Sequence, residues 1–106
     1  MYNNIGSLYL DLFKLEEAIS YLTTAKDIIY QKYDSSFPVL PAVLHNLGDA
    51  YQAMGEFKTA LSYNLEAYGI LSAQVSEDHP GIKQIKRSIV DLYKELGDIE
   101  SAMHYE

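Results

Sequence analysis

Three histidines are the side chains best suited to chemistry in this chain of 106 residues, which contains no cysteine. His45, His79 and His104 could each bind a metal ion or transfer a proton near neutral pH. A metal site on a helix needs ligands four residues apart on one face, and no two of these histidines have that spacing. Glu100 and His104 do share a face, but one carboxylate and one imidazole are too few ligands. We therefore expect no metal ion and no cofactor.

No catalytic motif is recognisable in the sequence. Glycine-rich phosphate loops, a Gly-x-Ser-x-Gly nucleophile turn and a catalytic His-Cys set are all missing. Pairs of carboxylates such as Asp98 and Glu100 fall at expected helix ends, where acids complement the helix dipole or face solvent. The residues therefore favour a protein that is not an enzyme.

The charge balance limits the partners of the chain. Eight basic and fifteen acidic side chains give a net charge of −7, which opposes attraction to nucleic acid or to an anionic membrane. No apolar run reaches the roughly 18 residues that a membrane-spanning helix needs, and the start of the chain does not resemble a signal peptide. The lack of cysteine favours a cytoplasmic location. A protein partner, neutral or basic, is expected.

A sequence repeat with a period of 42 residues organises the chain. Residues 4–9 (NIGSLY) return as 46–51 (NLGDAY) and again as 88–93 (SIVDLY). Nine positions are identical between residues 1–42 and 43–84 without a gap. A period of this length is typical of stacked supersecondary units, each too small to bury its own apolar face.

Each repeat has helical apolar spacing twice, with a break between the two stretches. Gly55 and Gly97 lie at the break, where a helix end favours a left-handed residue. The first repeat has Phe13 there, and we expect a less ideal turn with the same topology. The second helix of each full repeat should be long, about 15–33 and 57–75. The stretches 34–38 and 76–80 each predict a loop, an N-cap and a proline in the first turn of the next helix.

Small and aromatic residues recur in the same register. Glycine and alanine at equivalent positions predict a close crossing of the two helices of each pair: Gly6, Gly48, Ala18, Ala60 and Ala102. Val90 takes the place of the glycine in the third repeat. Six of the ten tyrosines fall at two repeated positions and are expected to pack between helices: Tyr9, Tyr51, Tyr93, Tyr21, Tyr63 and Tyr105.

The Leu-Gly-Tyr pattern of the first helix, the turn glycine and the alanines seven residues apart together resemble the tetratricopeptide repeat. The 42-residue unit and the Asp78-His79-Pro80 connection are similar to its kinesin light chain type. This resemblance implies an all-α fold, a right-handed α-solenoid of antiparallel helix pairs with about six helices. Repeat 1 would span about 1–37, repeat 2 about 38–79 and a partial repeat 3 about 80–106.

The same resemblance implies that the first helix of each repeat lines a concave groove that binds a peptide. Asn4 and Asn46 match asparagines that hold an extended peptide backbone, a task that suits an amide with both donor and acceptor. Only Arg87 and Lys94 bring permanent positive charge, which favours an internal peptide segment over a terminal carboxylate. The expected contact residues are Asn3, Asn4, Ser7, His45, Asn46, Asp49, Gln52, Arg87, Ser88, Asp91 and Lys94.

Three functions remain open, and the first is favoured. The chain would be a non-catalytic scaffold for protein-protein interaction, or else a structural segment of a longer array whose second helices or ends make the contacts. A regulatory enzyme that carries such an array, for example a phosphatase, is disfavoured by the missing catalytic set. The chain begins within a first helix and stops partway along a second one, so we also expect self-association through exposed apolar ends.

Overall fold

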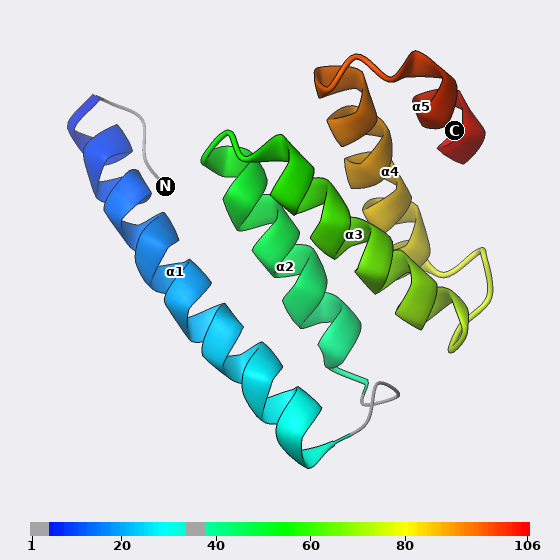
Figure 1. Ribbon diagram of the computed structural model, residues 1–106, viewed down its shortest axis with the longest axis horizontal. Helices are drawn as coiled ribbons and strands as arrows, with labels where there is room; N and C mark the ends of the chain where they lie inside the picture. Colours follow the sequence, from blue (N-terminus) through cyan, green and yellow to red (C-terminus); the bar gives the residue numbers. More distant parts are fainter. Residues whose placement is uncertain (1–4, 34–37) are drawn as a thin grey trace.

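The computed structural model describes the backbone of residues 5–33 and 38–106 and the side chains of residues 14–33 and 38–106. This part forms five helices: α1 (Ile5–Lys32), α2 (Leu40–Ala53), α3 (Phe57–Ser72), α4 (Pro80–Glu95) and α5 (Ile99–Tyr105). Each helix packs against the next one along the chain, and α2 also touches α4 (Figure 1). No strand occurs in these ranges, so the predicted all-α array of stacked helices is confirmed.

The first repeat differs from the prediction because α1 is one continuous helix of 28 residues. The predicted turn at Phe13 is wrong, and the described chain has five helices where about six were expected. The other two turns depend on Gly55 and Gly97, with φ angles of +83° and +81°, and no other described residue has a positive φ. Phenylalanine would be strained in that left-handed conformation, so the helix continues through residue 13.

The turns after α2 and α4 share one hydrogen-bonding pattern. The amide of Gly55 donates to the carbonyl of Gln52 at 3.0 Å, and the amide of Glu56 donates to that of Tyr51 at 2.9 Å. One period later, the amide of Gly97 donates to the carbonyl of Lys94 at 3.1 Å, and the amide of Asp98 donates to that of Tyr93 at 2.9 Å. This is the Schellman pattern, in which a left-handed residue lets the last carbonyls of the helix find donors.

The two helices that follow the predicted proline loops, α2 and α4, begin differently. His79 caps α4, where its Nδ1 accepts a hydrogen bond from the amide of Gly81 at 3.0 Å, and Pro80 is in the first turn as predicted. The prediction for Pro38 is wrong, because α2 begins at Leu40 and Pro41 stands in its first turn. A helix that began at Pro38 would put Pro41 at its fourth position, where the missing N–H would remove the first hydrogen bond of the helix.

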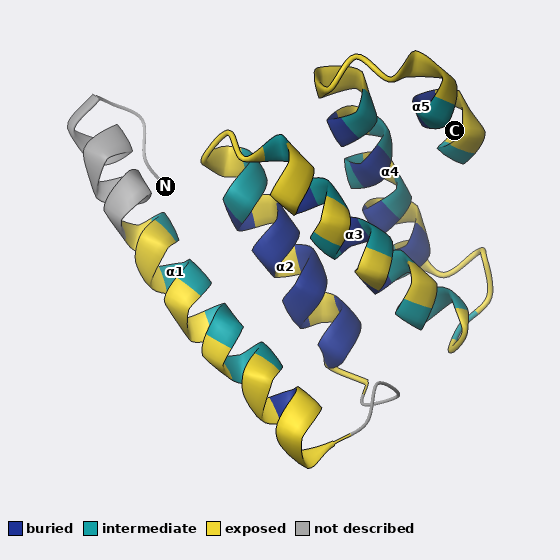
Figure 2. Cartoon of the chain, viewed as in Figure 1, coloured by how far each residue is buried: buried dark blue, intermediate teal, exposed yellow. Residues whose placement is uncertain are grey.

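The core lies between α2, α3 and α4, whereas most described residues of α1 are exposed (Figure 2). Ile29 is the one residue of α1 that is buried within the described side chains. Burial of a leucine or isoleucine contributes about 1.5–3 kcal/mol, so these residues stabilise the stack. The fully buried large apolar side chains are Leu40, Leu44, Leu47, Ile82, Ile89 and Leu92.

The α2–α3 pair crosses closely at Gly48, as predicted. A Cβ atom placed on Gly48 would lie 2.3 Å from Nδ2 of Asn64 and 3.1 Å from the carbonyl oxygen of Ala60. Ala60 and Asn64 have no exposed surface. Any side chain at residue 48 would therefore force the two helices apart.

The repeated tyrosines pack in pairs that are themselves repeated. Tyr51 stacks on Tyr63 with ring centroids 5.7 Å apart, and Tyr93 stacks on Tyr105 one period later at 5.9 Å. Tyr21 departs from the expected packing, since it is 79% exposed. Its helix does not fold back on itself, so no helix hairpin forms around it as one does around Tyr63.

Candidate functional site

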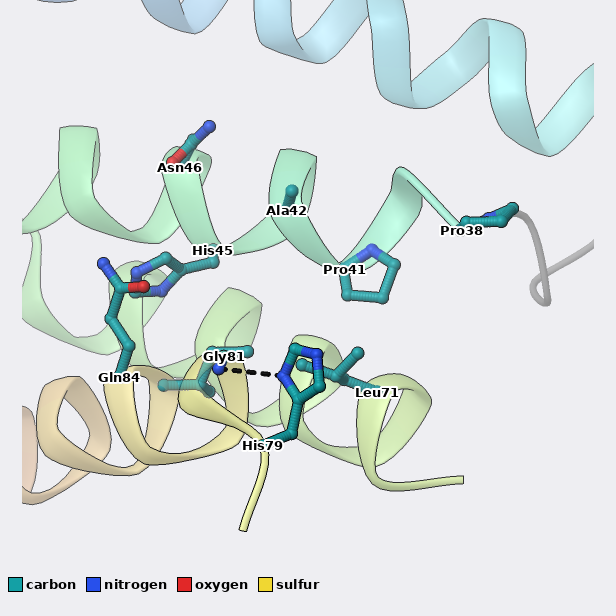
Figure 3. Close-up of a pocket in the computed structure, with 10 residues that line it drawn as sticks. Pro38, Pro41, Ala42, His45, Asn46, Leu71, His79, Gly81 and Gln84 are labelled. Carbon is teal, nitrogen blue, oxygen red and sulfur yellow. Dashed lines mark hydrogen bonds between the residues drawn. The ribbon is translucent and has the colours of Figure 1, made fainter. Parts of the chain in front are cut away.

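A hollow of about 310 Å³ lies where the first turns of α2 and α4 meet the end of α3. Its floor is apolar and its edges carry amide and imidazole groups, the usual composition of a site that holds a side chain and orients the chain around it. Figure 3 shows the side chains of His45 and Gln84 turned toward one another, while Asn46 points away from Gln84. The lining residues are Pro38, Pro41, Ala42, His45, Asn46, Leu71, His79, Gly81, Gln84 and Ile85.

Two of the residues that line this hollow carry exposed amides. Asn46 on α2 and Gln84 on α4 are both exposed, and both offer a donor and an acceptor. Among the apolar residues that line the hollow, Ala42 is exposed and Ile85 is buried, so part of the lining is an apolar surface that a side chain could contact. The arrangement suits a peptide whose side chain enters the hollow and whose backbone bonds to the amides.

His45 is held within the packing rather than presented to solvent. Nδ2 of Asn64 donates to the carbonyl of Ala60 at 3.2 Å, which turns Oδ1 of Asn64 toward Nδ1 of His45 at 2.7 Å. Nδ1 therefore carries a proton. The residue is only 7% exposed, and this bond links α2 to α3 below the hollow. His45 thus fixes the wall of the site.

The other ring nitrogen of His45 has no hydrogen-bond partner among the described residues. This Nε2 atom lies 3.4 Å from Oδ2 of Asp49, one helical turn further along α2. With the ring proton on Nδ1, both Nε2 and Oδ2 are acceptors, so no hydrogen bond joins them.

The remaining predicted contact residues of α2 are accessible to different degrees. Asn46 and Asp49 are exposed and Gln52 is half-buried. In the first repeat, Asn3 and Asn4 lie outside the described residues, and Ser7 lies in α1 with its side chain outside them. The structure therefore describes the predicted contact surface on α2 and α4.

On α4 the predicted contact residues do not form one surface with the hollow. Arg87, Asp91 and Lys94 are exposed and Ser88 is half-buried. Arg87 lines a second hollow between α4 and the end of α5, and Nζ of Lys94 lies 3.2 Å from Oε2 of Glu106. These two cations therefore lie on the α5 side of α4, away from Asn46.

Sequence reasoning missed Gln84 and the apolar floor. Gln84 and Ala42 are equivalent positions one period apart, so the repeat register contained the signal that both first helices contribute to one wall. Leu71 could not be found in this way, because it belongs to the end of α3 and reaches the hollow only through the packing of three helices.

The described residues also bear on metal binding and on membrane insertion. No group of three or more histidine, cysteine, aspartate or glutamate side chains there is placed to hold a metal ion. Within the same residues, no helix is both long and apolar enough to cross a membrane.

Comparison with known proteins gives one family. The tetratricopeptide repeat profile matches residues 1–73 and again residues 39–106, so the α2–α3 pair is matched twice in two registers. No curated protein matches the chain. The overlapping matches, the helix pairs and the glycine turns agree, and the chain belongs to the tetratricopeptide repeat family.

Proposed function

We propose that the chain is a non-catalytic scaffold that binds an extended segment of a partner protein along the groove between α2 and α4. Repeats of this family generally mediate protein-protein interaction. The observation that carries the proposal is the hollow of about 310 Å³ with an apolar floor and exposed amides at its edges. Similarity to the kinesin light chain type, supported by the 42-residue unit, and a cytoplasmic location belong to the same proposal.

The described residues suggest how such a segment would be held. An apolar side chain of the partner would enter the hollow and contact Ala42, Leu71 and Ile85. Asn46 and Gln84 would bond to its backbone at the edges. Affinity would come mainly from the buried side chain, because a few well-packed anchors supply most of the binding energy in such contacts.

The test begins with short peptides selected from a random library on the wild-type chain. Their dissociation constants are then measured by fluorescence anisotropy on variants. Asn46→Ala and Gln84→Ala are each expected to weaken binding by about tenfold, the loss of roughly 1.4 kcal/mol. Ala42→Trp should abolish binding, because the indole ring would fill the hollow.

The matched control is Thr59→Ala, which truncates an exposed side chain on α3. It is expected to leave the dissociation constant unchanged. Equal affinity of the wild type and Ala42→Trp for every selected peptide would overturn the proposal.

The alternative is a structural segment of an array whose contacts are made by the second helices or the ends. A specific observation favours it, since Ile99 and Met103 on α5 are 55% and 65% exposed. Apolar side chains this open suit contact with another helix. In this alternative the groove between α2 and α4 is empty and α5 carries the contacts.

A further inference from the structure

His45 keeps one hydrogen-bond acceptor without a partner beside the hollow between α2 and α4. Its Nδ1 atom is joined to Oδ1 of Asn64, and the amide of Asn64 cannot be turned round, because its Nδ2 donates to the carbonyl of Ala60. The lone pair of the neutral ring is therefore on Nε2. The side chain of His45 is 9% exposed, and Nε2 is buried with no hydrogen-bond partner among the described residues. A buried polar atom normally has such a partner, so this one needs an explanation.

Asp49 places a second acceptor next to this nitrogen. Oδ2 of Asp49 lies 3.4 Å from Nε2 of His45, and the side chain of Asp49 is 49% exposed. Two acceptors at this distance repel each other, whereas a donor between them would bond to both. Within the described residues, no lysine or arginine forms an ion pair with Asp49. Because the carboxylate is exposed, a donor from outside the chain can approach this pair of acceptors.

The neighbours of Asp49 on α2 bring no permanent positive charge. Residues three and four positions away share a helical face with it, and they are His45, Asn46, Gln52 and Ala53. One period later the equivalents of His45 and Asp49 are Arg87 and Asp91, so a cation and a carboxylate share one helical face there. The third repeat thus supplies within the chain the positive charge that the second repeat lacks.

The place of Asp49 on α2 determines where a cation would belong in the partner segment. Asp49 is four residues beyond His45, which lines the hollow, and this is about 6 Å along the helix. Successive residues of an extended segment advance by about 3.3 Å, and their side chains alternate in direction. If the segment runs along α2, a side chain two positions from the one in the hollow is on the same face and reaches Asp49.

From these contacts we infer that Asp49 and His45 select a lysine or arginine in the partner segment, two positions from the apolar side chain that enters the hollow. Its cationic group would donate to Oδ2 of Asp49, with Nε2 of His45 as the second acceptor. A basic segment also complements the net charge of −7 of the chain. This inference rests on the proposed function, because it requires a segment bound between α2 and α4.

The probes for the test are peptides selected on the whole chain from a library with a fixed central leucine. We expect lysine or arginine two positions from the leucine in the selected sequences. A fluorescent peptide with lysine there is then compared with one that has norleucine, which removes the charge and keeps the methylene chain. The norleucine peptide should bind about tenfold more weakly, and the difference should shrink as salt increases.

Variants of the chain test the direct contact. Asp49→Asn should weaken the lysine peptide by about tenfold and change the norleucine peptide by less than about twofold. Asp49→Lys should reject the lysine peptide and bind a version with glutamate in its place. Asp27→Asn is the matched control, because it removes an exposed carboxylate of α1 that lies beside Lys26. It should change the affinity for the lysine peptide by less than about twofold, since distant surface charges are screened.

Equal affinity of the lysine and norleucine peptides, or equal losses in Asp49→Asn and Asp27→Asn, would overturn the inference. The proposed function survives either result if Ala42→Trp still abolishes binding of both peptides. If Ala42→Trp binds both peptides as the wild type does, the proposed function itself fails. Sedimentation that shows a dimer which Asp49→Asn dissociates would also overturn the inference, because a second copy of the chain would then supply the cation.

Discussion

Single residues determine how closely the helices approach. Gly48, Ala60 and Asn64 allow α2 and α3 to cross with no space for a Cβ atom at residue 48. Asn64 uses both ends of its amide, one on the carbonyl of Ala60 and one on His45. The glycine and alanine could be predicted from their recurrence. The role of Asn64 could not, because its counterpart one period later is Glu106 and its bonds depend on the crossing itself.

Gly48→Ala is expected to destabilise the protein by about 1–3 kcal/mol, because the added methyl overlaps the side chain of Asn64 and crowds the Ala60 backbone. Thermal or urea unfolding measures the change. Gly69→Ala is the control, since nothing lies within 4 Å of the added Cβ and alanine favours a helix interior by up to about 1 kcal/mol. Similar unfolding of the two variants would show that the crossing is looser than described.

Tyr30 donates a hydrogen bond to Glu66 and so links α1 to α3. Burial, and then the bond and charge of Glu66, raise the pKa of Tyr30 to about 12 from an ordinary value of 10. A raised pKa favours the protonated hydroxyl in the folded state, so its contribution is complete below pH 10 and is lost as the pH rises toward 12.

The wild type should therefore lose more thermal stability between pH 10 and pH 12 than Tyr30→Phe does, as circular dichroism melts would measure. Tyr21→Phe, which changes a tyrosine that is 79% exposed, is the control and should behave as the wild type. If the melting temperatures of Tyr30→Phe and the wild type depended equally on pH, the hydrogen bond between Tyr30 and Glu66 would not stabilise the fold.

At the scale of helices, the sequence predicted every element from residue 39 onward better than it predicted the first repeat. The apolar spacing and the turn glycines placed α2 to α5. The spacing before Phe13 was equally helical, but periodicity alone does not show whether two helical stretches are joined or folded back. That choice depends on one residue able to adopt a positive φ at the turn position, where the first repeat has Phe13 in place of Gly55 and Gly97.

Gly55→Ala tests this reasoning directly. Its Cβ would meet nothing within 4 Å, so any cost comes from the left-handed backbone alone. We expect a loss of about 1–2 kcal/mol in the free energy of unfolding, with the helix content unchanged. Chemical denaturation followed by circular dichroism gives both quantities. If Gly55→Ala left the free energy of unfolding unchanged, the turn would not require glycine. The continuous α1 would then need another cause.

For the whole molecule, self-association through the ends stays a prediction, and the structure refines the residues that carry it. Ile89 and Leu92 are covered by the chain's own helices, whereas Ile99 and Met103 are open. Light scattering across a concentration series should show association in the wild type and less in Ile99→Glu with Met103→Glu. A wild type that stays monomeric throughout would rule out this role for α5.

The predicted contact residues show what a repeat register can and cannot locate. It named residues of both α2 and α4, and one of them, Asn46, lines the hollow between these helices. It also assigned Arg87 and Lys94 to the same contact surface, although they lie toward α5. Equivalent positions share a direction on their helices, but their neighbours change from one end of the stack to the other.

Binding of a partner segment between α2 and α4 is the function that we propose for this protein. The most direct measurement is backbone amide chemical-shift mapping of the labelled chain with a peptide selected on it. We expect the largest shifts at Ala42, Asn46, Gln84 and Ser88, in the lining of the hollow and on the next turn of α4. Shifts confined to exposed positions of α1 and α3, such as Thr24 and Thr59, would contradict it.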